Sequence, residues 1–351
     1  MHKSIQINGK GINAKETDYL KILANAIKIN AEIHANKAKM QTKGNEENKK
    51  EYLFDVTEVG GIYANTIYLV GTEKGLGVNN EGQINAYQEI TIDEYGNIRN
   101  KGTINAKENI DIKSETYINE ENAKTQSKNI NIQTKKQVAN EGIINGEQTN
   151  LATKELSNKG KIYGTEINIK ANDLSNIGQK GERPVIASRN NINLEIKNKI
   201  TNTNHALIRA EKNLIITGNI KEKSKTKEIQ NESAYIESGN DININSETIK
   251  NINTKITKET VRVKTEKRKE ASIQGKKERY QFSEKAEKGK AYITIEKGSY
   301  KLTIHHLNTP DGNDSKYFNT YDYDIKTYDD QVKESDPSCQ FLRWSKGKVF
   351  C

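Results

Sequence analysis

The sequence predicts an all-β protein built mainly as a right-handed parallel β-helix, a β-solenoid of stacked coils, with a small irregular β extension at its C-terminal end. Three observations predict this fold. One pattern of apolar and small residues recurs, most copies after residue 60 start 18 to 28 residues apart, and Asn-x-Gly triplets precede several copies. Repeats of this length are typical of solenoids, and the alternation of apolar and polar residues within each copy is the signal of a β-strand.

The long form of the repeat reads apolar, any residue, small, three of any, apolar, any, apolar. It fits five segments: Ile84-Ala86-Ile90-Ile92, Ile104-Ala106-Ile110-Ile112, Ile186-Ser188-Ile192-Leu194, Ile208-Ala210-Leu214-Ile216 and Ile236-Ser238-Ile242-Ile244. A form that is one residue shorter in the middle fits four: Ile22-Ala24-Ile27-Ile29, Ile33-Ala35-Ala38-Met40, Ile62-Ala64-Ile67-Leu69 and Ile162-Gly164-Ile167-Ile169. Degraded copies near Ile130-Ile132 and Ile144-Gly146 continue the register.

Each copy predicts two short strands and a turn. In a stack of coils, each strand pairs in parallel with the strand of the next coil about 4.8 Å away, so the inward isoleucines form columns. A column needs the same residue type at the same place in every coil, which explains the repetition. Roughly 250 residues at about 20 per coil predict some 12 coils. The handedness of parallel crossovers predicts right-handed winding.

The residues between the copies suit coil corners. Asn80-Glu81-Gly82, Asn100-Lys101-Gly102, Asn140-Glu141-Gly142 and Asn158-Lys159-Gly160 each precede a copy. Glycine and asparagine accept a positive φ, so we expect sharp corners there. We also expect stacked asparagines to hydrogen-bond from coil to coil, and the small residue of the repeat to lie where the core is tightest. The alternative fold is an antiparallel sandwich of short strands, which has no need of one inward pattern at a fixed period.

Residues 7–33 ("INGKGINAKETDYLKILANAIKINAEI") and 60–82 ("GGIYANTIYLVGTEKGLGVNNEG") resemble the filamentous haemagglutinin and contact-dependent inhibition exoproteins of bacterial two-partner secretion. The Asn-x-Gly-x-Ile-x-Ala repeats that follow resemble the haemagglutinin repeats of that family, and the resemblance runs from about residue 5 to about residue 250. It implies a β-helical rod that an outer-membrane partner transporter exports to the surface of a Gram-negative bacterium. Family members begin with a signal peptide and a secretion domain, which residues 1–20 do not show, so we expect a piece of a longer exoprotein.

The sequence divides into three parts: a β-helix over residues 1–250, a basic charged extension or linker over 251–290, and a C-terminal tail over 291–351. The middle part has only scattered apolar residues, and a projecting strand pair, a marginal helix and a flexible linker all fit it. In the tail, alternating runs on either side of Glu296-Lys297-Gly298-Ser299 predict a β-hairpin. Residues 317–330 alternate Tyr with Asp and predict a third strand. Cys339 and Cys351 form a small disulfide loop or remain thiols.

The net charge of +9 comes mainly from residues 255–290, where thirteen Lys or Arg face six Glu. The candidate contact residues for an anionic glycan are Lys264, Lys267, Arg268, Lys269, Lys276, Lys277 and Arg279. Such a cluster attracts sulfated or anionic surface polymers, and salt weakens the attraction. The alternative is a solvated face that keeps the rod soluble. Aromatic residues are not interleaved with these cations, so we expect no nucleic-acid partner.

No motif in the sequence predicts catalysis. The five histidines stand at no spacing typical of a zinc site, and the sequence has no Gly-x-Ser-x-Gly elbow and no phosphate-binding loop. No apolar run approaches the roughly 18 residues of a membrane helix. We therefore expect no enzyme activity, cofactor, metal or membrane span. The expected function is that of a rod segment of a secreted or surface-exposed adhesin, which binds a receptor or glycan on a host or neighbouring cell. The alternative is a stalk fragment of a contact-dependent growth inhibition exoprotein that lacks its toxin domain.

Overall fold

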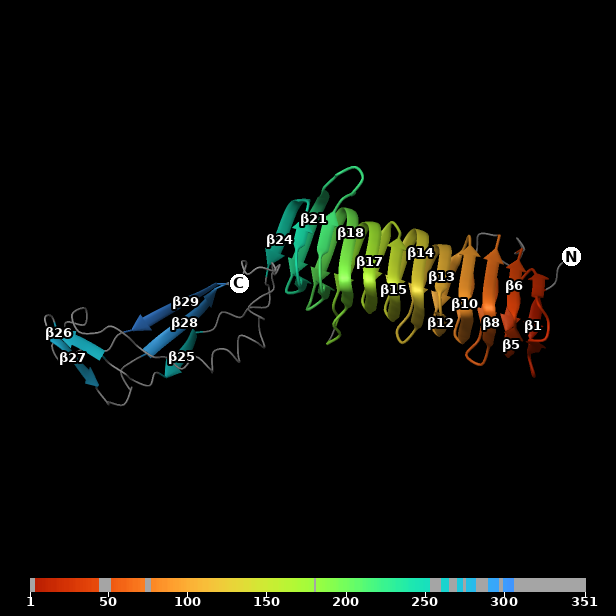
Figure 1. The fold of residues 1–351 in the computed structure, drawn as a ribbon, viewed down its shortest axis with the longest axis horizontal. Coiled ribbons are helices and arrows are strands. Elements are labelled where there is room, and N and C mark those ends of the chain that lie inside the picture. Colours follow the sequence, from red (N-terminus) through yellow and green to blue (C-terminus); the bar gives the residue numbers. More distant parts are fainter. Residues whose placement is uncertain are drawn as a thin grey trace. The chain divides into compact units, whose positions relative to one another are not determined.

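A computed structural model describes residues 4–43, 52–72, 77–179 and 181–252, together with five strands between residues 260 and 305. The described residues up to Asn251 form one unit, a β-solenoid of about 11 turns whose strands pair in parallel from coil to coil (Figure 1). The all-β fold class predicted from the repeats is therefore confirmed. An antiparallel sandwich is excluded for this unit, because each of its 24 strands belongs to one continuous sheet with parallel pairing between coils.

Each coil has three faces, and each face places two side chains inward. In the coil that starts at Ile84, the inward residues are Ile84 and Ala86 on face 1, Ile90 and Ile92 on face 2, and Ile98 and Asn100 on face 3. The next coil repeats the pattern in register, since Ile84 pairs with Ile104 and Ile90 with Ile110. Most of these inward side chains have no solvent exposure. The core is therefore a set of aliphatic columns along the rod.

The strands follow these faces. Face 1 is formed by β2 (Ile12–Ala14), β5 (Glu32–Ala35), β12 (Thr103–Ala106), β19 (Leu207–Ala210) and β22 (Tyr235–Ser238). Face 2 is formed by β3 (Leu20–Ala24), β6 (Lys37–Thr42), β20 (Leu214–Thr217) and β23 (Ile242–Ile244). Face 3 is formed by β1 (Ile5–Ile7), β4 (Ile27–Ile29), β7 (Phe54–Val56), β9 (Val78–Asn80), β11 (Asn97–Asn100), β16 (Glu155–Asn158), β21 (Thr226–Glu232) and β24 (Ser246–Ile252). Longer strands cover two or three faces: β8 (Gly61–Gly71), β10 (Gln83–Glu94), β13 (Asn109–Asn119), β14 (Lys124–Asn140), β15 (Ile143–Ala152), β17 (Lys161–Ile177) and β18 (Val185–Thr203).

The expectation of two strands per coil is wrong, because face 3 supplies a third. Its sequence signal is an apolar residue two positions before an asparagine, as in Ile98-Arg99-Asn100 and Leu156-Ser157-Asn158. That pattern is too short to be distinguished from a corner by periodicity alone. Pairing between coils identifies it as a strand, since Ile98 pairs with Val78 below and Tyr117 above.

One of the nine predicted copies lies in other columns than expected. Ile22 pairs with Met40 on face 2, and Ile27 pairs with Phe54 on face 3. The partner of Ile33 is instead Ile12. The copy that the structure shows is Ile12-Ala14 followed by Leu20-Ile22. Five residues separate its two halves, whereas both forms of the repeat have only two or three residues there, so neither form fits it.

The glycines of the Asn-x-Gly corners have a different role from the one predicted. None of Gly82, Gly102, Gly142 and Gly160 has a positive φ. They are needed because the corners stack closely: a Cβ on Gly102 would lie 2.0 Å from the carbonyl oxygen of Gly82, and one on Gly160 would lie 2.2 Å from that of Gly142. Contact between corners, rather than backbone conformation, therefore requires glycine at these positions.

The expectation that asparagines stack is confirmed on face 3. Nine asparagines form one column, which we call the Asn ladder: Asn80, Asn100, Asn119, Asn140, Asn158, Asn176, Asn202, Asn231 and Asn251. Each Nδ2 donates to the Oδ1 of the next coil at 2.7 to 2.8 Å. The amide's other hydrogen commonly reaches a backbone carbonyl at the start of face 1, as from Asn100 to Lys124 at 3.2 Å. The ladder thus ties the corner between faces 3 and 1 to the core.

The degraded copy near residue 125 has a packing reason. Thr125 and Ser127 stand where other coils have isoleucine and alanine, and Thr125 pairs with Ile104 below and Ile144 above. The fully buried Tyr117 lies in the same region of the core, and its hydroxyl contacts Thr125 Oγ1 at 2.5 Å. The threonine therefore gives the buried phenol a hydrogen-bond partner that an isoleucine at this position would not supply.

The five remaining strands belong to a second unit. β25 (Thr260–Lys264), β28 (Lys290–Glu296) and β29 (Ser299–His305) form an antiparallel three-stranded sheet, and β26 (Glu270–Ile273) pairs with β27 (Lys276–Gln281). Glu296 pairs with Ser299, so the predicted hairpin is confirmed. The third strand of this sheet is β25. The Tyr-Asp segment 317–330, which the sequence predicted as the third strand, lies outside the described residues.

Candidate functional site

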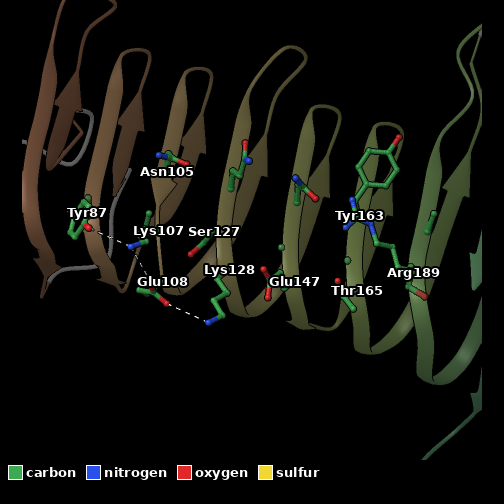
Figure 2. A pocket seen from close by; sticks show the side chains of 18 of the residues that line it. Tyr87, Asn105, Lys107, Glu108, Ser127, Lys128, Glu147, Tyr163, Thr165 and Arg189 are labelled. Carbon is green, nitrogen blue, oxygen red and sulfur yellow. Dashed lines mark hydrogen bonds and ion pairs between the residues drawn. The ribbon is translucent and has the colours of Figure 1, made fainter. Parts of the chain in front are cut away.

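A groove with a volume of about 1090 Å³ runs along the corner between faces 1 and 2 of the rod (Figure 2). It exists because the inward residue at this corner is small in every coil. The residues along its base are Ala86, Ala106, Ser127, Gly146, Gly164 and Ser188. A Cβ on Gly164 would lie 2.7 Å from Ile167 Cγ1, which confirms that the core is tight here. Because the inward residues at this corner are small, the surface over them is recessed and forms the base of the groove.

Two rows of outward side chains form the walls of the groove. In four of these coils, the residue before the small residue forms the first row. It consists of three amides, Asn105, Gln126 and Asn145, which we call the amide row, and of Tyr163. The residue after each small residue gives the second row: Tyr87, Lys107, Lys128, Glu147, Thr165 and Arg189. Consecutive members of the first row are in register, because Asn105 pairs with Gln126 and Asn145 with Tyr163. Figure 2 shows Asn105 and Tyr163 on one side of the hollow and the labelled residues of the second row on the other.

The N-terminal end of the groove holds a small ionic network. Lys107 Nζ lies 4.8 Å from the centre of the Tyr87 ring and 3.4 Å from its hydroxyl. Glu108 lies between two lysines, 4.0 Å from Lys107 Nζ and 3.7 Å from Lys128 Nζ. These groups are well exposed, so the pairs hold side chains in place more than they stabilise the fold.

A buried carboxylic acid lies elsewhere in the rod, at the end of face 2. Glu94 is 3% exposed, and neither carboxylate oxygen has a hydrogen-bond partner. It occupies space beside Gly71, where a Cβ would lie 1.9 Å from Oε2. Burial raises the pKa of Glu94 from 4.5 to about 8, with a further contribution from the charge of Asp93. The side chain is therefore neutral at pH 7, a property that nothing in the repeat pattern indicated.

The predicted anionic-glycan residues are spread over separate strands. Lys264 ends β25, and Lys276, Lys277 and Arg279 belong to β27, which lies in a different sheet. Lys267, Arg268 and Lys269 lie outside the described residues, as do Cys339 and Cys351. The anionic-glycan contact therefore stays a prediction.

The described ranges contain neither a cluster of metal ligands nor a membrane-spanning helix. No three side chains of His, Cys, Asp or Glu in these ranges are grouped so that they could hold a metal ion. Within the same part of the chain, no helix has the length and hydrophobicity needed to cross a membrane.

The chain is similar to several bacterial toxins. It is 34% identical to the Toxin CdiA of Yersinia pestis over 97 residues, which cover 23% of this chain and 3% of that protein. It is 34% identical to the tRNA nuclease CdiA of Yersinia mollaretii over 109 residues, which cover 27% of this chain and 4% of the relative. A Toxin CdiA from Escherichia coli is 34% identical over 89 residues, 22% of this chain and 3% of that toxin. No family model matches the chain. No solved structure matches it either.

The matches therefore span only 3 to 4% of the length of these relatives. They are consistent with the solenoid, because a repeat array in a very long protein gives short matches of this kind. The similarity supports the resemblance seen in residues 7–33 and 60–82: over about a quarter of its length, this chain is similar to CdiA contact-dependent inhibition exoproteins of two-partner secretion.

Proposed function

We propose that the solenoid is a stalk segment of a contact-dependent inhibition exoprotein, which an outer-membrane partner exports and which holds a distal part of the molecule away from the cell surface. The observation that carries this proposal is the uninterrupted stack of about 11 coils in a chain similar to CdiA toxins. Each coil needs only its neighbours for stability, so coils add reach without a larger core. The rod itself has no catalytic role in this proposal.

The register of the columns supplies the test. Removing residues 84–207 joins Gln83 to Ile208, and the first column stays continuous because Gln83 and Leu207 occupy equivalent positions. The deletion removes the coils that begin at Ile84, Ile104, Thr125, Ile144, Ile162 and Ile186, and shortens the rod by about 29 Å at the parallel-strand spacing. An in-register duplication of the same residues lengthens it by the same amount.

Both variants are made within the longer exoprotein of the producing bacterium, with an epitope inserted after Cys351. We expect both variants to be displayed on the cell surface. In electron tomography, the epitope should lie nearer to the outer membrane in the deletion and farther from it in the duplication. Inhibition of neighbouring cells should depend on the length of the rod. A chain that stays inside the cell, or inhibition that is indifferent to length, contradicts the proposal.

A second candidate is the adhesin segment that the sequence predicted, resembling filamentous haemagglutinin, with a receptor or glycan bound on the side of the rod. The observation that favours it is the groove, whose walls carry polar groups over several coils. The two candidates differ in one respect: an adhesin rod binds cells through its own surface, so changes in the groove reduce cell binding while rod length is unchanged.

A further inference from the structure

Two columns of outward amides on the rod behave differently, and the difference marks the groove. On face 2, Asp111, Asn131, Asn150, Asn168 and Asn193 stack in register. Each asparagine of this column donates from Nδ2 to the side chain one coil below at 2.8 to 2.9 Å. We call these five residues the outer amide ladder. Each asparagine therefore donates one hydrogen bond within the protein, and Asn131, Asn150 and Asn168 also accept one.

The amide row on face 1 has equivalent stacking but no such bonds. Asn105 pairs with Gln126, and Gln126 with Asn145, at the same coil-to-coil register. Within the part of the chain that the structure describes, none of these three side chains makes a hydrogen bond. Since each amide has two donor hydrogens and an acceptor oxygen, the wall of the groove presents a row of unused donors and acceptors.

The charges of the groove exclude a strongly charged ligand. Its cations are Lys107, Lys128 and Arg189, and its anions are Glu108, Glu147 and Glu211. The two sets balance in number, and they alternate along the corner. A phosphate or sulfate polymer gains affinity by neutralising its charges with a uniform set of cations, which this groove does not offer.

The spacing of the row favours one kind of neutral polymer. Equivalent amides recur once per coil, about 4.8 Å apart, which is close to the length of one sugar ring in an extended chain. An extended peptide advances about 3.4 Å per residue, so its residues do not match the coil spacing one to one. Tyr87 and Tyr163 place aromatic rings along the groove, and rings of this type pack against the C–H faces of sugars while their hydroxyls remain in water.

From these observations we propose that the groove binds one strand of an unbranched, uncharged polysaccharide, laid along the rod axis, with the amides of Asn105, Gln126 and Asn145 hydrogen-bonded to successive sugar hydroxyls. The proposal does not depend on the stalk function, since a stalk and an adhesin both expose this corner. It also differs from the anionic-glycan contact predicted at residues 264–279, because it names another surface and a ligand of opposite charge character.

The test uses the full 351-residue chain and three neutral probes, the hexasaccharides of cellulose, starch and laminarin, with binding measured by calorimetry. We expect at least one hexasaccharide to bind, and the trisaccharide of the same series to bind at least tenfold more weakly, because the groove spans several coils. Binding should change little between 50 mM and 500 mM NaCl, since no net charge is neutralised.

Two triple variants separate the groove from the rest of the rod. Asn105→Ala, Gln126→Ala and Asn145→Ala together remove the amide row, and we expect at least a tenfold loss of affinity. Asn131→Ala, Asn150→Ala and Asn168→Ala together remove the same number of amides from the outer amide ladder, and we expect affinity to be retained. Thermal melting of both variants, and of Tyr163→Ala as an independent change in the groove, confirms that the rod is folded.

Four results overturn the proposal. These are the binding of none of the three neutral hexasaccharides, equal affinity in the amide-row variant and the unchanged chain, an equal loss in the outer-ladder variant, and binding confined to heparin with a steep dependence on salt. The last result instead supports the basic residues 264–279. Because none of these readouts involves export or target-cell inhibition, failure here leaves the stalk proposal standing, and failure of the stalk proposal leaves this one standing.

Discussion

Asn140 lies within the Asn ladder, fully buried, with Asn119 donating to it and Asn158 accepting from it, both at 2.8 Å. Asn140→Ala leaves the Nδ2 of Asn119 and the Oδ1 of Asn158 each short of one bond inside the core. A buried polar group without its partner costs about 1–3 kcal/mol, so we expect a loss of about 2–4 kcal/mol in the free energy of unfolding by urea.

The control for that prediction is Asn131→Ala in the outer amide ladder. Asn131 also bonds to both neighbouring coils, at 2.8 Å each, but water replaces its partners when it is removed. We expect a loss below about 1 kcal/mol. If both substitutions lower stability equally, the buried ladder contributes no more than the exposed one.

Glu94 gives the rod a dependence on pH. Because its folded pKa of about 8 lies above the ordinary value of 4.5, the folded state keeps a proton that the unfolded state releases. The free energy of unfolding therefore falls as pH rises, by about 1.4 kcal/mol per unit across the window from about 4.5 to 8, and is constant above it. Glu94→Gln does not titrate, so we expect it to remove this slope in urea titrations at a series of pH values. An unchanged slope in the variant assigns the dependence to other groups.

At the level of the coil corner, Gly102 tests why glycine is present. Gly102→Ala places a methyl group 2.0 Å from the carbonyl oxygen of Gly82, and either the corner or the strand pairing must shift. We expect at least about 2 kcal/mol of destabilisation, in the range of other severe steric changes. Lys101→Ala, next to it, breaks an ion pair with Glu81 whose two side chains are 35% and 28% exposed, and we expect a loss of less than about 1 kcal/mol. Equal melting temperatures for the two variants contradict the stacking explanation.

The strand faces make a second prediction about elements. Ile110 is fully buried in a face 2 column, whereas the Lys107 side chain is 59% exposed at the corner beside it. Ile110→Asp buries a charge without a partner, so we expect it to unfold the neighbouring coils cooperatively. Lys107→Asp loses only its contacts with Tyr87 and Glu108, and we expect a change below about 1 kcal/mol. Circular dichroism melts that coincide for the two variants contradict this inward and outward assignment.

For the whole rod, stability should vary along its length. A coil in the middle is covered on both sides, but the last described coil is not: Ile249, two residues before Asn251, is 48% exposed, while Ile130 is fully buried. Stability in stacked repeats is a sum over neighbour contacts. We therefore expect amide hydrogen exchange to be slowest over residues 104–185 and faster toward residue 250, whereas uniform protection along the rod would indicate a single cooperative unit.

Much of this architecture follows from the sequence because the repeat reports directly on the columns. Equivalent residues of the long form of the repeat, such as Ile84 and Ile104 or Ile90 and Ile110, pair as their spacing predicted. The misplaced copy at Ile22 and the unpredicted strand of face 3 have the same physical cause. Corners between faces vary in length without disturbing the columns, so a fixed spacing cannot follow the chain through every corner.

By itself, the sequence determined that aliphatic residues stack in parallel coils, because that conclusion depends on residue types at regular intervals. The resemblance to contact-dependent inhibition exoproteins also came from the sequence, through the particular stretches 7–33 and 60–82. Only the tertiary structure decided which polar groups are satisfied. Asn140 and Asn105 are the same residue type on the same rod, yet one is held in the buried ladder and the other has its amide open to the groove. Hydrogen-bond satisfaction depends on the neighbouring coil and the local shape of the corner, and these arise only when the coils are stacked.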